Sequence, residues 1–256
     1  MRGVYDVARR QGHGFGGYHV AMTDTTALRS GLIGNLRGCR DAERAIFAAL
    51  DPAVRDAPGA DGGWSPKDNL THLSAWRLRQ ATKMAAIHDG LPEPALPGDD
   101  IDATNAIYHA ERAGWSWDRV DEDADASLEA LVAQITVADD EALVDQKVLG
   151  PIMGDGPEHD LAHLAAIAKT VGMSDRVHAL ADRTQAMLDE GVWPDRAAAF
   201  ARYNLACFAA LDGDLERARA LLRLALPGQA DLIELAPKDD DLVALREEIP
   251  TLAVGT

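Results

Sequence analysis

The 256-residue sequence predicts an all-α protein. Apolar residues recur at helical spacing over most of the chain, and residue types that begin and end helices stand at the borders of these segments. Alanine is abundant and aromatic residues make up only 5% of the sequence, a composition that suits closely packed helices. We therefore expect helices along the whole chain, taken below in order.

The charge balance limits the classes of partner. Lys and Arg number 25 and Asp and Glu number 42, so the net charge is −17. Such a surface repels phosphate backbones and anionic lipid, which argues against nucleic acid and membrane partners. No apolar run is long enough to span a bilayer. Cys39 and Cys207 occupy core-like helical positions in different predicted domains, so we expect buried thiols and a cytoplasmic protein.

The first segments comprise a leader and one long helix. Residues 1–22 are rich in glycine and predict a flexible leader, with Met22 as a candidate natural start. The predicted first domain covers residues 23–172. Its first helix spans about residues 25–50, where apolar residues form a stripe at helical spacing, and Asp51 followed by proline ends it.

The second helix has a clear start. Ser65 is of the type that caps helices, Pro66 suits the first helical position, and Asp68 in the first turn complements the helix dipole. Gly90 marks its end. His72 shares a face with Trp76 and borders the apolar side of this helix.

Three further segments complete the connection to the next long helix. Residues 91–98 are rich in proline and predict a crossover, after which a helix begins at Asp99 or Asp100. Another helix is expected over residues 117–136. Residues 137–148 predict a linker with a short helix over residues 140–144.

Two histidines define the candidate site. Residues 154–170 predict a helix in which His159 and His163, four positions apart, lie on one face. Two imidazoles arranged in this way can occupy adjacent corners around a divalent metal, although ordinary hydrogen-bonded histidines would show the same spacing. Asp160 replaces the glutamate that zinc peptidases need directly after the first histidine, and we expect it to face elsewhere, so a peptidase is not expected.

The C-terminal region, residues 173–256, differs in pattern. After a helix over about residues 174–190, residues 195–226 have the small and apolar spacing of a tetratricopeptide-like hairpin, with Gly213 at the turn. A single repeat does not stand alone, so we expect it to pack on the preceding helix and on residues 232–246. The acidic run Asp239–Asp241 predicts a helix cap and a solvated face.

Three segments resemble one family. WSPKDNLTHLSAWR, residues 64–77, resembles the second helix of the DinB-like superfamily of four-helix bundles, especially its ClbS/DfsB branch. Residues 101–120 are similar to the third-helix segment of that branch, and His159 with His163 resembles the metal-binding pair of the superfamily. The likeness covers about residues 24–172.

The resemblance implies a DinB-like four-helix bundle with a polar pocket at one end, here followed by the tetratricopeptide-like hairpin. It implies that His72, His159 and His163 hold a divalent metal, with Zn, Ni or Fe as candidates. A fourth helix shifted by one turn would instead use Asp155 and His159. The candidates for lining the pocket are Trp76, Asn105 and Tyr108.

Two functions remain open at this point. By resemblance, the protein acts on or binds a small electrophilic or thiol-linked molecule in detoxification or self-resistance, as a metal-dependent hydrolase or a thiol-dependent transferase. The alternative is a non-catalytic stress-response module that binds a small ligand. In either case the C-terminal region is a candidate surface for a homodimer or a protein partner.

Overall fold

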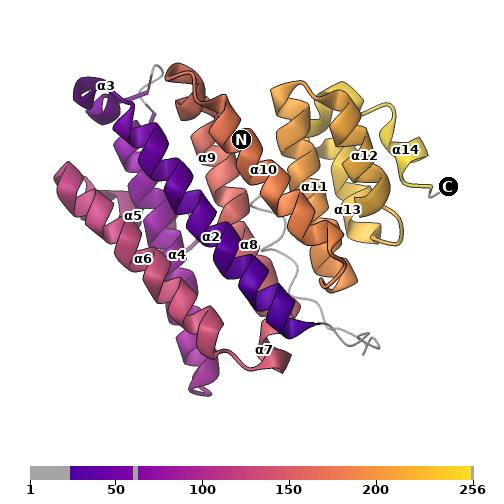
Figure 1. The fold of residues 1–256 in the computed structure, drawn as a ribbon, viewed down its shortest axis with the longest axis horizontal. Helices are drawn as coiled ribbons and strands as arrows, with labels where there is room; N and C mark the ends of the chain where they lie inside the picture. The colour runs from indigo at the N-terminus through magenta and orange to yellow at the C-terminus, as the bar shows by residue number, and fades with distance from the viewer. Residues whose placement is uncertain (1–23, 60–62, 255–256) are drawn as a thin grey trace. The chain divides into compact units, whose positions relative to one another are not determined.

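The computed structural model describes residues 24–59 and 63–254. Within these ranges the chain forms helices and no strand, which confirms the all-α prediction (Figure 1). The predicted leader and the candidate start at Met22 lie outside the described residues. The chain divides into two compact units, one of residues 29–182 and one that combines the chain up to Leu28 with residues 183–254.

The larger unit contains three long helices and several short ones. The long helices, which run alongside one another in Figure 1, are α2 (Thr25–Ala48), α4 (Pro66–His88) and α6 (Trp117–Val137). The others are α3 (Pro52–Asp56), α5 (Ile101–Arg112), α7 (Asp140–Val144), α8 (Gln146–Gly154) and α9 (Pro157–Thr170). Helix α10 (Ser174–Asp189) begins in this unit and continues into the other.

Helix α4 lies at the centre of this unit. It packs against α3, α5, α6, α8 and α9, and most of its residues are buried, in keeping with a helix that is covered on nearly all sides. The apolar stripes predicted for α2 and α6 face the interior. The buried residues of these stripes include Leu32, Leu36, Ile46, Phe47, Val120, Ala124, Leu128, Leu131 and Ile135.

The start of α4 forms as predicted. The Ser65 hydroxyl accepts a hydrogen bond from the Asp68 amide at 3.0 Å, and the Asp68 carboxylate accepts one from the Ser65 amide at 3.0 Å. Pro66 occupies the first turn, where no backbone donor is needed. This reciprocal cap fixes where the helix begins and therefore where His72 lies along it.

Helix α8 differs from the sequence prediction. The short helix α7 forms as expected, but residues predicted as linker and as helix start also form a helix that contains Pro151. The Asp145 side chain caps α8, and four apolar side chains of the helix are buried, which compensates for the hydrogen bond that proline removes. The buried residues are Val148, Leu149, Ile152 and Met153.

The helical conformation is interrupted between α8 and α9 at Gly156. A Cβ atom on this glycine would lie 2.7 Å from the Ile152 carbonyl oxygen and 2.7 Å from Leu36 Cδ2. The backbone at Gly156 therefore lies too close to α2 and α8 to leave room for a side chain at this position. The helix that bears His159 and His163 begins directly after this close approach.

The smaller unit is organised around a helical hairpin. Helix α11 (Asp195–Asp212) and helix α12 (Leu215–Ala225) are joined at Gly213, whose φ of +90° favours glycine. The remaining elements are α13 (Ala230–Leu235), η1 (Ala236–Lys238), η2 (Asp240–Leu245) and α14 (Ile249–Leu252). The η2 segment packs on α11 and α12, as the sequence predicted for residues 232–246.

The acidic run in this unit corrects one prediction. Asp239 caps η2 by accepting a hydrogen bond from the Asp241 amide at 3.0 Å, as expected. Its carboxylate is not on a solvated face, however, because Asp239 is 3% exposed and accepts a hydrogen bond from the Tyr203 hydroxyl at 2.8 Å. The apolar pattern of the flanking residues gave no sign of this long-range contact.

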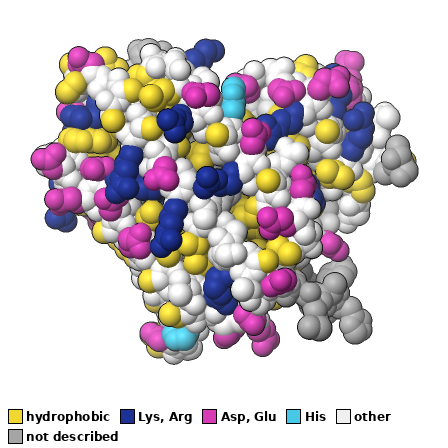
Figure 2. Space-filling view, viewed as in Figure 1, with side chains coloured by type: hydrophobic (Ala, Val, Ile, Leu, Met, Phe, Trp, Pro, Cys, Tyr) yellow, Lys and Arg dark blue, Asp and Glu magenta, His cyan; other side chains and the backbone are white. Residues whose placement is uncertain are grey.

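The two cysteines, Cys39 and Cys207, are free and buried, as their helical positions predicted. Acidic and basic side chains are interspersed over the face shown in Figure 2. Over the part of the chain that the structure describes, no helix combines the length and the apolar character needed to cross a membrane.

Candidate metal centre

Three imidazoles from two helices lie against one another in the larger unit. His72 lies on α4, and His159 and His163 lie one turn apart on α9. The Nε2 atoms of His72 and His159 are 2.9 Å apart. Ring centroids are separated by 4.6 Å for His72 and His159 and by 4.8 Å for each of the other two pairs. One nitrogen from each ring lies within 4.8 Å of the others, so the group could hold a metal ion.

A hydrogen bond from α4 orients His163. Its Nδ1 atom is 2.7 Å from the side-chain oxygen of Asn69, one turn before His72. Because that oxygen can only accept, Nδ1 donates and Nε2 of His163 keeps its lone pair. Metal-binding histidines usually donate their second ring N–H in this way, which fixes the tautomer and the ring orientation.

Burial keeps the His163 ring uncharged. His72 and His159 are 7% and 5% exposed, and burial lowers the pKa of His163 to about 4. At neutral pH the His163 ring is therefore neutral, as a metal ligand must be.

Aromatic side chains flank the histidines. The Trp64 ring lies 4.7 Å from the His72 ring and stacks on the His109 ring at 5.7 Å with an interplanar angle of 4°. His109 Nε2 in turn lies 3.4 Å from the Asp68 carboxylate. His109 was not among the site residues that the sequence predicted. The structure connects it through Trp64 to the candidate centre.

The three residues predicted to line a pocket form one cluster between α4 and α5. The indole N–H of Trp76 donates to the side-chain oxygen of Asn105 at 2.9 Å, and the edge of the Trp76 ring meets Tyr108 with centroids 5.7 Å apart. Trp76 also makes an edge contact with His72 at 6.3 Å. Burial raises the pKa of Tyr108. Trp76 thus joins this cluster to His72, while the role of the three residues as a pocket wall stays a prediction.

Two carboxylates lie close in sequence to the histidines of α9. Asp155 ends α8 and is 2% exposed, and Glu158 in the first turn of α9 is 6% exposed. The alternative register would pair Asp155 with His159. The group of ligand atoms within 4.8 Å of one another consists instead of His72, His159 and His163.

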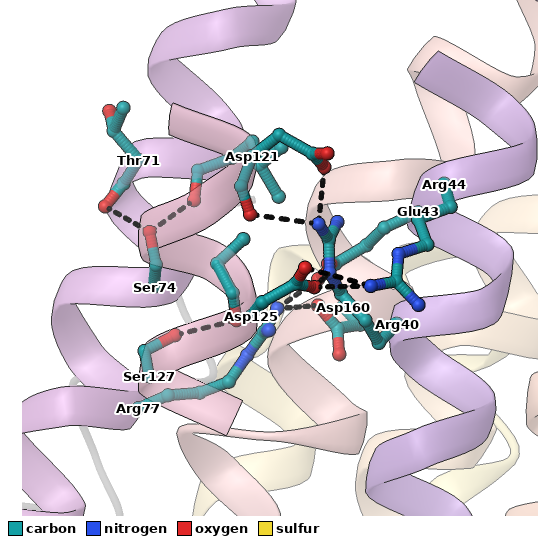
Figure 3. A network of polar contacts seen from close by, with 12 residues as sticks. Arg40, Glu43, Arg44, Thr71, Ser74, Arg77, Asp121, Asp125, Ser127 and Asp160 are labelled. Carbon is teal, nitrogen blue, oxygen red and sulfur yellow. Dashed lines mark hydrogen bonds and ion pairs between the residues drawn. The ribbon is translucent and has the colours of Figure 1, made fainter. Parts of the chain in front are cut away.

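A buried ion network involves Asp160, the residue that follows His159 on α9 (Figure 3). The Arg77 guanidinium on α4 contacts Glu43 on α2 and donates to the Asp160 carboxylate on α9 at 3.1 Å. All three side chains are at most 1% exposed. The sequence interpretation placed Asp160 away from the metal site, and the structure shows what it contacts there.

The network continues to α6. Arg40 on α2 donates to Glu43 at 3.2 Å and to Asp125 at 2.7 Å, and it also contacts Asp121. Asp125 also forms an ion pair with the half-exposed Arg44 at 2.7 Å. Ion pairs therefore join α2, α4, α6 and α9 to one another, as Figure 3 shows from close by.

Burial and mutual charge shift the pKa values in this network. Burial raises the pKa of Asp160 to about 8, with Arg77 opposing the shift and Glu43 adding to it. Burial alone would lower the pKa of Arg77, but the charges of Glu43 and Asp160 raise it. At neutral pH Arg77 therefore stays charged, and the raised pKa favours the protonated form of Asp160.

Sequence reasoning missed Asn69 and the ion network. Asn69 precedes His72 by three positions on the same face of α4, a spacing that could have suggested it as a partner of the site. Arg77 gave no such signal, because polar residues stand at many other positions of α4. Its partners on α2 and α9 are 34 and 83 residues away, beyond the reach of local patterns.

Comparisons with protein-family models, with curated proteins and with solved structures found no match to this chain. The functional interpretation therefore depends on the residues and their geometry.

Proposed function

We propose that the larger unit is a DinB-like bundle in which His72, His159 and His163 bind a divalent metal, and that the protein acts on or binds a small molecule at this centre. The observation that carries the proposal is the convergence of three buried imidazoles from α4 and α9, with one nitrogen from each within 4.8 Å of the others. The resemblance of residues 64–77 and 101–120 to the ClbS/DfsB branch supports the same class of protein.

The donor set fits a divalent transition metal. Bonds of about 2.0–2.1 Å in tetrahedral geometry place two ligand nitrogens about 3.3 Å apart. The Nε2 atoms of His72 and His159 are 2.9 Å apart, so a small rotation of the rings is sufficient. Neutral imidazole suits Zn, Ni and Fe, and the Asn69 contact with His163 supplies an outer hydrogen bond of the usual kind.

A metal with three protein ligands retains an open position. When bound, such an ion would polarise a substrate, lower the pKa of a bound water or hold a thiol as thiolate. The residues of the chain would supply the surroundings: Trp64 and Trp76 contact His72 from two directions and limit the access of water to the ring. The resemblance favours a small electrophilic or thiol-linked molecule as the substrate of a hydrolase or a thiol-dependent transferase.

The test is metal analysis of protein purified without a histidine tag. We expect the content of Zn, Ni or Fe to fall by one equivalent in His72→Ala and in His159→Ala. The matched control is His88→Ala, because His88 is an exposed histidine at the end of the same helix α4. Its metal content should equal that of the wild type.

An equal metal content in all four proteins would contradict the proposal. A protein that takes up no metal at the histidines, and whose unfolding ignores chelators, would favour the non-catalytic binding module. In that case the next experiment would be to test whether the C-terminal region binds a protein partner or a second copy of the chain.

A further inference from the structure

A second group of potential metal ligands lies in the smaller unit. Cys207 projects from α11, while Asp239 and Asp241 stand at the start of η2. One ligand atom from each lies within 4.8 Å of the others. The Cys207 Sγ atom is 3.8 Å from Asp239 Oδ2. No imidazole takes part, so the group is chemically distinct from the histidine centre.

The two carboxylates of this group, those of Asp239 and Asp241, form no ion pair with a Lys or Arg side chain of the described residues, although Asp239 is 3% exposed. The nearby Arg246 donates instead to the Asp239 backbone carbonyl and to the exposed Asp240 carboxylate, each at 3.3 Å. Buried carboxylates are normally paired with a cation or coordinate a metal, because an uncompensated buried charge is costly.

Neutral donors occupy the carboxylate of Asp239. The Tyr203 hydroxyl donates to Oδ2 at 2.8 Å, the Cys207 thiol donates to the same oxygen, and Oδ1 accepts from the Asp241 amide. None of these donors brings a positive charge to the buried carboxylate, so a bound cation would supply the charge that they lack.

We propose that Cys207, Asp239 and Asp241 form a second divalent-metal site, suited to an ion that accepts a thiolate, such as Zn²⁺. Zinc bonds of about 2.3 Å to sulfur and about 2.0 Å to oxygen place these two ligands about 3.5 Å apart in a tetrahedron. The observed 3.8 Å between Sγ and Oδ2 is close to this separation. Binding displaces the thiol proton to solvent, and the ion replaces it as the link between α11 and η2.

Cobalt(II) is the probe that separates the two sites. We would titrate it into full-length, metal-free, reduced protein. A thiolate ligand produces an intense near-ultraviolet charge-transfer absorption that an all-imidazole site lacks. We expect this absorption in the wild type, in Cys39→Ala, and in the double variant His72→Ala/His159→Ala, and we expect its loss in Cys207→Ala. Because Cys39 is the other cysteine and is equally buried, it is the matched control.

A second pair of variants keeps the test decisive if Cys207→Ala fails to fold. Asp241→Asn changes a partly exposed ligand, and Asp240→Asn changes its exposed neighbour, which pairs with Arg246. Loss of a ligand should weaken cobalt binding at least as much as loss of an outer-sphere contact does, by about 10- to 100-fold. Asp240→Asn should bind as the wild type does.

Three outcomes would overturn the second site. They are the absence of the charge-transfer absorption in the wild type, its persistence in Cys207→Ala, and equal cobalt affinity of Asp241→Asn and Asp240→Asn. None of these bears on the histidine centre, because the double histidine variant removes that centre without touching Cys207, Asp239 or Asp241. Failure of the histidine proposal would likewise leave the thiolate absorption unchanged.

Discussion

Two buried polar clusters of the larger unit share the helices α4 and α9 but differ in the groups that they bring together. In the histidine cluster, three imidazole rings lie with their centroids 4.6–4.8 Å apart. In the ion cluster, Arg77 lies between Glu43 and Asp160. His159 and Asp160 are consecutive residues, so one turn of α9 contributes to both.

Because of this difference, we expect the two clusters to have different roles. The ion cluster contains its own counter-charges and connects four helices, so its contacts are already made and it positions the backbone. The imidazoles are held in place by packing and by the Asn69 hydrogen bond, and they offer nitrogen donors to an ion. The predictions below separate positioning from binding, beginning with the largest expected effect on stability.

Arg77→Met should produce the largest loss of unfolding free energy. It removes the cation that Glu43 and Asp160 share in a fully buried site, and breaking a buried ion pair typically costs about 3–5 kcal/mol of unfolding free energy. Urea denaturation at pH 7 measures it. The control is Arg44→Met, which breaks the half-exposed pair with Asp125 and should cost less than about 1 kcal/mol. Equal losses in both variants would contradict a dominant role for the buried network.

The two clusters should respond to pH in opposite directions in metal-free protein. Because folding raises the pKa of Asp160 to about 8, its contribution to stability is present at low pH and is lost as the pH rises through 8. Because folding lowers the pKa of His163 from 6.5 to about 4, its contribution is present above pH 6.5 and is lost as the pH falls toward 4.

Each contribution approaches about 1.4 kcal/mol per pH unit at most. Unfolding free energies measured at several pH values in chelator should fall between pH 6.5 and 8 in the wild type, and less so in Asp160→Asn. Between pH 4 and 6.5, where the two contributions oppose each other, His163→Gln should differ from the wild type in slope. Parallel curves for the wild type and both variants would refute the assigned shifts.

Gly156→Ala should destabilise the protein by about 1–3 kcal/mol, the usual range for overpacking. The new Cβ would meet the Ile152 carbonyl and Leu36, and relief of the clash moves the start of α9, so metal affinity should fall as well. Gly154→Ala is the matched control, because its Cβ would meet nothing within 4 Å and alanine favours helix by about 0.5–1 kcal/mol. Thermal unfolding and metal titration of both variants measure the differences in stability and in metal affinity. A Gly156→Ala variant as stable as the wild type would disprove the close approach.

Asn69→Ala should have the smallest effect on metal-free stability, about 1 kcal/mol for a lost neutral hydrogen bond. Its effect on metal affinity should be larger, about 10- to 100-fold, because the orientation of His163 is lost. Asn105→Ala removes the comparable hydrogen bond to Trp76 and should leave metal affinity unchanged. Metal titration of the two variants side by side checks this, and equal affinities would show that Asn69 does not orient a ligand.

The parts of the fold that depend on local chemistry could be predicted from the sequence. The capping box at Ser65, the turn glycine at Gly213 and the apolar stripes placed most helix borders within two residues of those observed. Helix α8 was missed because a proline inside a helix is tolerated only when burial of the neighbouring side chains compensates for it, and burial is a property of the tertiary structure.

The candidate site was predictable only in part. The spacing of His159 and His163 follows from helix geometry, whereas His72 came from a resemblance and not from a pattern within the chain. The partners of Arg77 and the contact between Tyr203 and Asp239 join residues 34 to 83 positions apart. Such pairings depend on how helices pack, which neither periodicity nor composition contains.

The separation of His72 and His159 has a consequence for the flexibility of the chain. These residues are 87 positions apart, and α5, α6, α7 and α8 lie between them. An ion bound to both rings would close a loop around these four helices, and it would restrict partly unfolded forms much as a covalent cross-link does. Removal of that ion would give the intervening helices room to separate from α4 and α9 while each remained helical.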